Sequence, residues 1–198
     1  MSFYERHGKR AFDIAGGAVL GVAGAPFMAA AAALLWRTQG RPILFHQDRV
    51  GRDGREFTIV KFRTMVPGAA GHGAGMWFEP DDPRVTPVGR WLRASSIDEL
   101  PQVWNVLLGE MSWIGPRPEA IALSEWYMAE LPFYTYRHIV RPGITGWAQV
   151  NQGHVADLDS VYAKLHYDFY YIKNFSGWLD ILILARTVAT VFSGNGAK

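Results

Sequence analysis

Two adjacent carboxylates, Asp98 and Glu99, are the residues of this chain whose types and placement best suit chemistry. Pro101 follows them, and because proline has no backbone N–H it belongs in the first turn of a helix, which places a helix start near Asp98. The partial positive charge at a helix N-terminus stabilises ionised carboxylates, which can act as nucleophiles or metal ligands. A purely structural alternative starts the helix at Ser96, where Ser96 and Glu99 would form a capping box.

Basic side chains occur in the sequence on both sides of this pair. The arginine guanidinium group matches phosphate oxygens with two parallel hydrogen bonds, and a proline-rich segment such as Gly115-Pro116-Arg117-Pro118 holds such a group with little conformational freedom. Any one of these residues taken alone could be a solvated surface charge. As a set beside a carboxylate pair they predict a phosphate-bearing substrate with Mg²⁺, since zinc would require His or Cys ligands. The set comprises Lys61, Arg63, Arg90, Arg93, Arg117, Arg137 and Arg141.

Several other kinds of site find no support in the sequence. The chain of 198 residues has no cysteine, which excludes disulfides, thiolate metal sites and a cysteine nucleophile. The histidines lack ligand spacing, no serine lies in a Gly-x-Ser-x-Gly context, and the glycine-rich stretch 68–75 lacks the lysine and hydroxyl residue of a P-loop. A formal net charge of +2 is too small to indicate nucleic acid as a partner.

An uncharged apolar segment, residues 14–36, is the most distinctive element that could position this chemistry. As a helix its 23 residues would extend about 34 Å, enough to cross the roughly 30 Å hydrocarbon core of a membrane. Pro26 lies near its middle, after several glycines, and predicts a kink or break. The segment is too long for the apolar region of a cleaved signal peptide.

Basic residues flank this apolar segment on both sides. An excess of Lys and Arg marks the cytoplasmic side of a membrane segment. A spanning helix could place only one flank there, whereas a re-entrant helix that bends at Pro26 and leaves by the face it entered satisfies both. The pattern therefore favours a re-entrant helix, with a spanning helix as the alternative. The flanking residues are Arg6, Lys9 and Arg10 on one side and Arg37, Arg41, Arg49, Arg52 and Arg55 on the other.

The rest of the chain predicts a small β element followed by helices. Residues 42–47 and 56–62 are rich in β-branched and aromatic side chains, and Gly51-Arg52-Asp53-Gly54 between them predicts a hairpin. Glycine and proline in residues 67–83 predict a long loop. Helices are expected from Asp98 past Leu107, from Pro118 to Leu131, from Asp159 or Ser160 to Ile172, and from Ser176 to before Gly194.

Together these elements predict an α+β fold that is mostly helical, with an N-terminal re-entrant membrane helix, a small β-hairpin or sheet and interfacial amphipathic helices. Residues 1–40 would form the membrane helix with its basic flanks, and residues 41–198 one continuous catalytic domain on the cytosolic face. The last helix carries Asp180 and Arg186 among apolar residues, so it is too short and too charged to span a membrane. It either lies in the interface, with Trp178 at headgroup depth, or belongs to the core.

Six ordered motifs extend over essentially the whole chain and are highly specific in combination. With them the chain resembles the small monotopic phosphoglycosyl transferases, the bacterial sugar transferases that initiate glycan assembly. The resemblance implies transfer of a phospho-sugar from a UDP-sugar to undecaprenyl phosphate or a similar polyprenol phosphate, with release of UMP. The motifs are Lys9-Arg10-Ala11-Phe12-Asp13, Lys61-Phe62-Arg63-Thr64-Met65, Ser96-Ile97-Asp98-Glu99-Leu100-Pro101-Gln102, Gly115-Pro116-Arg117-Pro118, Arg141-Pro142-Gly143-Ile144-Thr145-Gly146-Trp147 and Tyr167-Asp168-Phe169-Tyr170-Tyr171.

The resemblance also implies roles for individual residues. Asp98 would attack the sugar-bearing phosphorus to give a covalent phosphoglycosyl-aspartate intermediate, and Glu99 would hold Mg²⁺, the implied cofactor. The implied substrate-binding residues are Lys61, Arg93, Arg117, Arg141 and Asp168. The protein would be monotopic in the bacterial inner membrane with its active site on the cytoplasmic face. Its partners would be the lipid bilayer and, at the protein level, a second copy of the chain and downstream glycosyltransferases.

Two departures from the family pattern and two rival functions accompany this resemblance. Ala25 stands before Pro26 where family members often carry serine, and the Gly- and Ala-rich stretch 68–80 leaves the donor sugar open. One rival is a membrane-anchored scaffold of a glycan-assembly complex in which Asp98 and Glu99 are only helix caps. The other is a magnesium-dependent diphosphate hydrolase that uses the same residues with water as the final acceptor.

Overall fold

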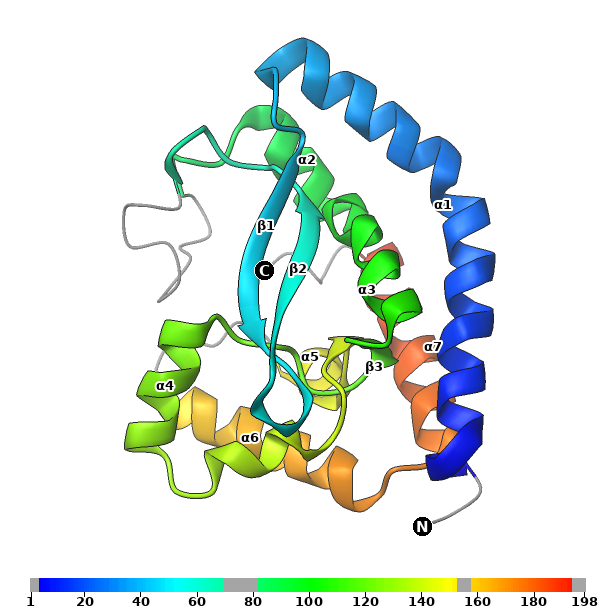
Figure 1. Cartoon of the computed structure of the whole chain (residues 1–198), viewed down its shortest axis with the longest axis vertical. Coiled ribbons are helices and arrows are strands. Elements are labelled where there is room, and N and C mark those ends of the chain that lie inside the picture. The colour runs from blue at the N-terminus through cyan, green and yellow to red at the C-terminus, as the bar shows by residue number, and fades with distance from the viewer. Residues whose placement is uncertain (1–3, 70–81, 153–157, 194–198) are drawn as a thin grey trace.

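The structure of the chain, a computed structural model, describes residues 4–69, 82–152 and 158–193. Within these ranges helices dominate, and the named strands form an antiparallel hairpin and a short parallel pair, as expected for a mostly helical α+β fold. In Figure 1 the hairpin lies centrally, α4 and α6 lie at one end, and α1 arches along one side. The α-helices are α1 (Lys9–Gln39), α2 (Pro87–Ala94), α3 (Val103–Leu108), α4 (Ile121–Glu130), α5 (Trp147–Asn151), α6 (Leu158–Lys173) and α7 (Gly177–Ser193). The strands are β1 (Leu44–Val50), β2 (Glu56–Phe62), β3 (Ser112–Ile114) and β4 (Gly143–Thr145), and shorter helical turns are η1 (Tyr4–Gly8), η2 (Arg52–Gly54), η4 (Ile97–Gln102) and η5 (Tyr134–Ile139).

The predicted hairpin is confirmed. Strands β1 and β2 pair antiparallel with Leu44 opposite Phe62 and Val50 opposite Glu56, so β1 extends three residues beyond the predicted end. The turn between them places Asp53 at φ 57° and Gly54 at φ 75°. Asp and Gly tolerate this left-handed backbone better than most residues, which is why the turn forms here. The hairpin carries Lys61 near the end of β2.

The helix predicted from Pro118 begins three residues later than expected. Helix α4 starts at Ile121, because the segment before it is extended: Ala120 forms a β-bridge with Arg49, and the Pro118 carbonyl accepts a 2.8 Å hydrogen bond from Arg49 Nη1. The helices predicted from Asp159 or Ser160 and from Ser176 correspond to α6 and α7, and the Leu179 N–H donates to Ser176 Oγ. Of the loop predicted over 67–83, residues 70–81 lie outside the described part of the chain.

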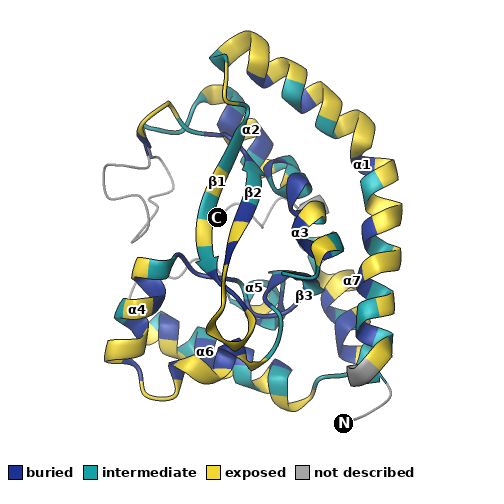
Figure 2. Ribbon diagram, viewed as in Figure 1, coloured by how far each residue is buried: buried dark blue, intermediate teal, exposed yellow. Residues whose placement is uncertain are grey.

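The apolar segment forms a single helix, α1, that continues through Pro26 without a break. Among the described residues it is the one helix long and apolar enough to cross a membrane. Its direction changes along its length, and its outer face is exposed (Figures 1 and 2). Its inner face carries glycines that allow close approach to η4 and α3: a Cβ at Gly24 would lie 3.9 Å from Leu100, and one at Gly17 would lie 2.8 Å from Leu107.

Both ends of α1 pack against the same body of the protein. Near its start, the buried side chain of Lys9 donates a 2.7 Å hydrogen bond to Asp180 in α7, which also accepts hydrogen bonds from Tyr4 and Tyr171. Near its end, Leu35 is fully buried in a cluster with Phe62 of β2 and Leu92 of α2. The helix is thus attached to the domain along its whole length, from the first turn to the last.

Helix α7 has one face in the core and one face exposed. Leu179 and Ile183 are buried with Tyr171 and Ile114, whereas the opposite face exposes apolar side chains. Trp178 is 75% exposed. The buried face agrees with a core helix, and a position of the exposed face in the membrane interface stays a prediction. Its exposed apolar residues are Trp178, Ile181, Leu184 and Val188.

Candidate active site

Asp98 lies in η4, directly after the end of helix α2. The predicted helix start near Asp98 takes the form of this 3₁₀ segment, and Pro101 lies inside it. The capping-box alternative is wrong: Ser96 has a left-handed backbone at φ 55° and its side chain makes no capping hydrogen bond. The Glu99 side chain, which would complete such a box, turns instead toward basic residues from other segments. The carboxylate pair is therefore available for a role other than capping.

Glu99 is held by two cations from distant parts of the sequence. Its Oε1 accepts hydrogen bonds of 2.6 Å from Lys61 Nζ and 2.6 Å from Arg117 Nη2, and Oε2 lies 3.5 Å from Arg117 Nη1. Burial alone would raise the pKa of Glu99, but Arg117 and Lys61 hold it well below its ordinary value. Burial lowers the pKa of Lys61, and the charge of Glu99 opposes this shift. Glu99 also raises the pKa of Arg117. This arrangement fixes Glu99 as a carboxylate and fixes both cations around it.

The Asp98 carboxylate is in the opposite situation. It is buried, at 8% exposure, and among the described residues no side chain donates a hydrogen bond to it. Burial and the neighbouring charge of Glu99 raise its pKa to about 6, against the smaller influence of Lys61, Arg93 and Arg117. A desolvated carboxylate without hydrogen-bond donors is a better nucleophile than a solvated one, because fewer bonds must break before it attacks.

Arg93 lies in the last turn of α2, close enough to Asp98 for its charge to act on that carboxylate. Its Nε donates a 2.9 Å hydrogen bond to Thr64 Oγ1, just beyond strand β2. Burial lowers its pKa, and the charges of Asp98 and Asp82 oppose that effect. Helix α2 approaches the strand so closely because Gly89 is in contact with the Thr64 backbone, where a Cβ would lie 2.0 Å from the Thr64 oxygen. Of the predicted basic set, the structure thus brings Lys61 and Arg117 into contact with Glu99 and places Arg93 near enough to act on Asp98.

The segment that carries Arg117 is interlocked with the segment after Arg141. Strands β3 and β4 are parallel, with Ile114 opposite Thr145, and the Gly115 N–H donates to the Thr145 carbonyl at 2.9 Å. A Cβ at Gly143 would lie 2.1 Å from the backbone nitrogen of Gly115, so only glycine fits at this crossing. The glycines of these two motifs thus allow the close backbone contact that orients Arg117.

Two of the predicted substrate-binding residues do not join this cluster. Arg141 donates through Nε to the Gly109 carbonyl at the end of α3, near Arg10 and Arg52 rather than near Glu99. Asp168 is 1% exposed, and its carboxylate is paired with the guanidinium group of Arg137. In this structure both side chains are engaged by partners other than the Glu99 cluster, so their predicted role in substrate binding stays a prediction. The positions of Arg141 and Asp168 depend on burial and on partners far away in the sequence. Neither can be read from the local sequence pattern.

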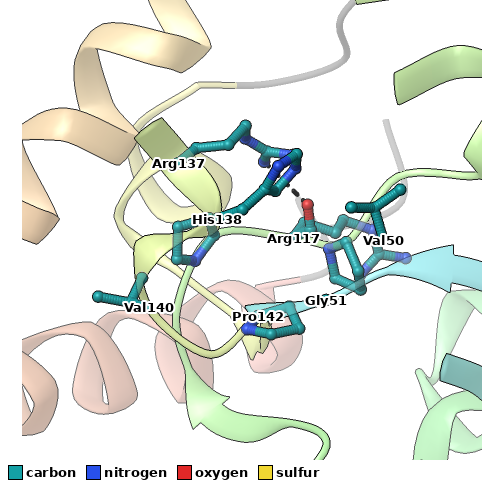
Figure 3. Close-up of a pocket in the computed structure, with 9 residues that line it drawn as sticks. Val50, Gly51, Arg117, Arg137, His138, Val140 and Pro142 are labelled. Carbon is teal, nitrogen blue, oxygen red and sulfur yellow. Dashed lines mark hydrogen bonds between the residues drawn. The ribbon is translucent and has the colours of Figure 1, made fainter. Parts of the chain in front are cut away.

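Arg137 is a site-associated residue that the sequence placed only within the general basic set. Its Nη2 donates a 2.8 Å hydrogen bond to the carbonyl oxygen of Arg117, as drawn in Figure 3. A small pocket lies behind the Arg117 segment, with Val50, Gly51, His138, Val140 and Pro142 in its wall. Burial lowers the pKa of His138 to about 4, helped by the charge of Arg137, so this histidine is neutral near pH 7. Its Nε2 atom is buried without a hydrogen-bond partner among the described residues.

The carboxylate oxygens of this site also indicate what kind of magnesium ion it could bind. Within the described ranges, no group of three His, Asp or Glu side chains converges as a metal cage. Counting partners in the described part of the chain, Glu99 Oε2 has only its 3.5 Å contact with Arg117, and Asp98 accepts no hydrogen bond from a side chain. Mg²⁺ commonly binds through one or two carboxylates, with waters and substrate phosphates completing its octahedron. Asp98 and Glu99 fit an ion that arrives with a phosphate-bearing substrate, and they do not fit an ion enclosed by protein alone.

The fold and the site together define a class: a protein whose long apolar N-terminal helix packs against a carboxylate and cation cluster suited to phosphate groups. The family model described as bacterial sugar transferase matches residues 4–194. The chain belongs to the bacterial sugar transferase family, in agreement with the resemblance seen in its motifs.

Individual relatives are similar over nearly the whole chain. One is a UDP-N-acetylgalactosamine-undecaprenyl-phosphate N-acetylgalactosaminephosphotransferase of Aeromonas hydrophila, 48% identical over 190 residues that cover 96% of this chain and 45% of that protein. Another is an undecaprenyl-phosphate glucose phosphotransferase of Komagataeibacter xylinus, 40% identical over 98% of this chain and 38% of that protein. A third is a UDP-glucose:undecaprenyl-phosphate glucose-1-phosphate transferase of Caulobacter vibrioides, 41% identical over 96% of this chain and 71% of that protein. The chain thus spans less than half the length of the first two.

Proposed function

We propose that this protein transfers a phospho-sugar from a UDP-sugar to undecaprenyl phosphate, releasing UMP. The observation that carries the proposal is the buried Asp98 carboxylate, which accepts no hydrogen bond from the described residues, beside a Glu99 neutralised by Lys61 and Arg117. The names of the Aeromonas and Caulobacter relatives support a UDP-sugar donor, and all three names support undecaprenyl phosphate as the acceptor. Since those names differ in the sugar, they leave the donor sugar of this chain to experiment.

The reaction proceeds in two displacements at one phosphorus atom. In the first, an Asp98 carboxylate oxygen attacks the sugar-bearing phosphorus, the bond from that phosphorus to the bridging diphosphate oxygen breaks, and UMP leaves with the bond's electron pair. In the second, a phosphate oxygen of undecaprenyl phosphate attacks the same phosphorus, and the Asp98 carboxylate is regenerated. The lipid product is undecaprenyl-diphospho-sugar. Covalent catalysis of this kind divides one difficult substitution into two easier ones.

The basic residues of the site neutralise the phosphates during both displacements. Arg117 offers a planar fork of donors at the edge of the Glu99 pair, and Arg93 adds a second guanidinium charge that acts on Asp98. Fixed cations aimed at the leaving phosphate stabilise the charge that develops there. Glu99 would hold Mg²⁺, which supplies further neutralisation of the diphosphate when it is bound. Lys61 keeps Glu99 ionised and oriented for that role.

We propose that α1 is re-entrant and places this site at the cytoplasmic face of the bacterial inner membrane. The middle of α1 packs against η4, since a Cβ at Gly24 would contact Leu100, one residue after Glu99. If α1 spanned the bilayer, the charged site would lie at the depth of the hydrocarbon core, where ionised side chains are costly. A helix that enters and leaves by one face keeps the site at the membrane surface. It also places the basic residues of both flanks on the cytoplasmic side.

A donor panel tests the proposed function. Purified protein in lipid nanodiscs is incubated with undecaprenyl phosphate, Mg²⁺ and individual radiolabelled UDP-sugars, and both UMP and labelled lipid are measured. We expect labelled lipid with one or a few donors, none after chelation of Mg²⁺, and none with Asp98→Asn. Turnover by Asp98→Asn would overturn the nucleophile assignment. Loss of UDP-sugar without labelled lipid would indicate a diphosphate hydrolase, and no turnover with any donor would indicate a scaffold.

A further inference from the structure

The segment that carries Arg117 is held by its backbone from behind. Three consecutive carbonyl oxygens each accept a hydrogen bond from a different part of the chain. Pro116 O accepts from the Gly143 N–H at 2.9 Å, and Arg117 O accepts from Arg137 Nη2 at 2.8 Å. Pro118 O accepts from Arg49 Nη1 at 2.8 Å. The guanidinium group of Arg117 points forward to Glu99 from a backbone that is fixed at every residue.

Arg137 is the donor in this set that is itself fixed by an ion pair. Its Nε and Nη2 donate to Asp168 Oδ2 at 3.0 and 2.8 Å, and its Nη1 donates to the Tyr134 hydroxyl at 3.1 Å. The side chains of Arg137 and Asp168 are each 2% exposed. A buried ion pair contributes little net stability compared with an apolar pair of similar volume, so stability alone gives a weak reason for this one.

We propose that Arg137 and Asp168 are positioning residues, which act through the carbonyl oxygen of Arg117 to aim its guanidinium group at Glu99 and the donor diphosphate. This inference rests on the proposed function. Asp168 in α6 orients Arg137, and Arg137 connects α6 to the Gly115-Pro116-Arg117-Pro118 segment. Asp168 thereby belongs to the active site without contact to substrate, which explains a carboxylate so deeply buried behind a phosphate-binding arginine. Displacement of a phosphate ligand by as little as about 1 Å can cost about 100-fold in rate.

The test uses a paired replacement that leaves no buried charge. Removing one partner alone would leave the charge of the other buried and unpaired, which risks unfolding. Replacing both partners with apolar residues is commonly tolerated. We expect Arg137→Met/Asp168→Leu to unfold at a temperature close to that of the unmodified protein and to lower kcat/KM for the UDP-sugar by about 10- to 100-fold, the range expected for coupled residues. Tyr134→Phe is the matched control, because it removes one Arg137 hydrogen bond without touching the Arg117 segment. It should retain activity within about twofold.

A double-mutant cycle separates positioning from general damage. The Arg117→Lys background keeps a cation but loses the planar guanidinium group. In that background the paired replacement should lower kcat/KM for the UDP-sugar by less than about threefold. An equal loss in both backgrounds, or full activity of the paired variant, would overturn the inference. If the paired variant does not fold, Arg137→Lys takes its place, since lysine keeps the charge but lacks the rigid planar fork of donors that joins Asp168, Tyr134 and the Arg117 carbonyl.

Hydrogen exchange gives a readout that does not depend on turnover. The Gly115 and Gly143 amides, which donate within this crossing, should exchange at least about tenfold faster in the paired variant and unchanged in Tyr134→Phe. Unchanged exchange in the paired variant would contradict the inference. Lack of transfer by the unmodified protein with every donor would instead contradict the proposed function, so the two failures are distinguishable.

Discussion

Asp98 and Glu99 are consecutive residues whose carboxylates lie in opposite electrostatic surroundings. Glu99 accepts hydrogen bonds from Lys61 and Arg117 at 2.6 Å each, which hold its pKa well below the ordinary value. Asp98 has no such donors among the described residues, and burial raises its pKa to about 6. Two carboxylates whose pKa values are driven apart can take different roles at one pH. This difference supports the proposed roles, with Asp98 as the attacking group and Glu99 as its electrostatic support.

The pH dependence of the first displacement should report Asp98. Only the ionised carboxylate attacks, so kcat/KM for the UDP-sugar should rise about tenfold per pH unit below pH 6 and level off above it. Initial rates of UMP release between pH 4.5 and 8 measure this, with nanodisc integrity checked at each pH. A rate that stays constant from pH 5 to pH 7 would exclude Asp98 as the titrating nucleophile.

Asp98→Asn should stabilise the folded protein while abolishing transfer. The pKa of Asp98 is higher in the folded protein than the value of 3.8 expected of an unfolded chain, so ionisation destabilises the fold. The neutral amide should therefore increase the free energy of unfolding by up to about 3 kcal/mol above pH 6, and this increase should vanish below about pH 4. Thermal unfolding of both proteins at pH 4 and pH 7.5 measures the difference. The exposed Asp159 provides the control, and Asp159→Asn should show no comparable gain.

Gly89→Ala should disrupt the site from a distance. A Cβ there would lie 2.0 Å from the Thr64 carbonyl oxygen, so α2 must move away from the strand end and take Arg93 with it. We expect a loss of more than about 1 to 3 kcal/mol in the free energy of unfolding and reduced transfer. Gly21→Ala is the matched control, since its Cβ would meet Val103 at an ordinary 3.8 Å and alanine favours the helix. Chemical denaturation of both variants tests this, and equal stability would contradict the tight contact.

The topology of α1 can be tested because the chain contains no cysteine. His7 and Thr38 are exposed residues at either end of α1, and cysteine is introduced at one position at a time. For a re-entrant helix, both His7→Cys and Thr38→Cys should be protected from a membrane-impermeant maleimide in intact cells and labelled after permeabilisation. Labelling of one of the two in intact cells would instead indicate a spanning helix.

Local sequence patterns were sufficient for several elements of this protein. The hairpin follows from alternating β-forming residues around Asp53-Gly54, and α1 follows from the uncharged run across residues 14–36. The carboxylate pair and the arginines near it could be chosen by residue type and by motif. Each of these features depends on neighbours within a few positions, where propensity and hydrophobic pattern act directly.

The tertiary structure decided how those residues act. Lys61 and Arg117 meet Glu99 from 38 and 18 residues away, and this contact replaces the capping box that the local sequence allowed. Asp168 and Arg137 are 31 residues apart, and their pairing buries a carboxylate that the resemblance had implied to bind substrate. Such contacts are set by which segments cross, here the parallel β3 and β4 and the glycines between them. The sequence by itself determined which charged groups this protein has for phosphate chemistry, and burial and long-range pairing decided which of them gather around Asp98 and Glu99.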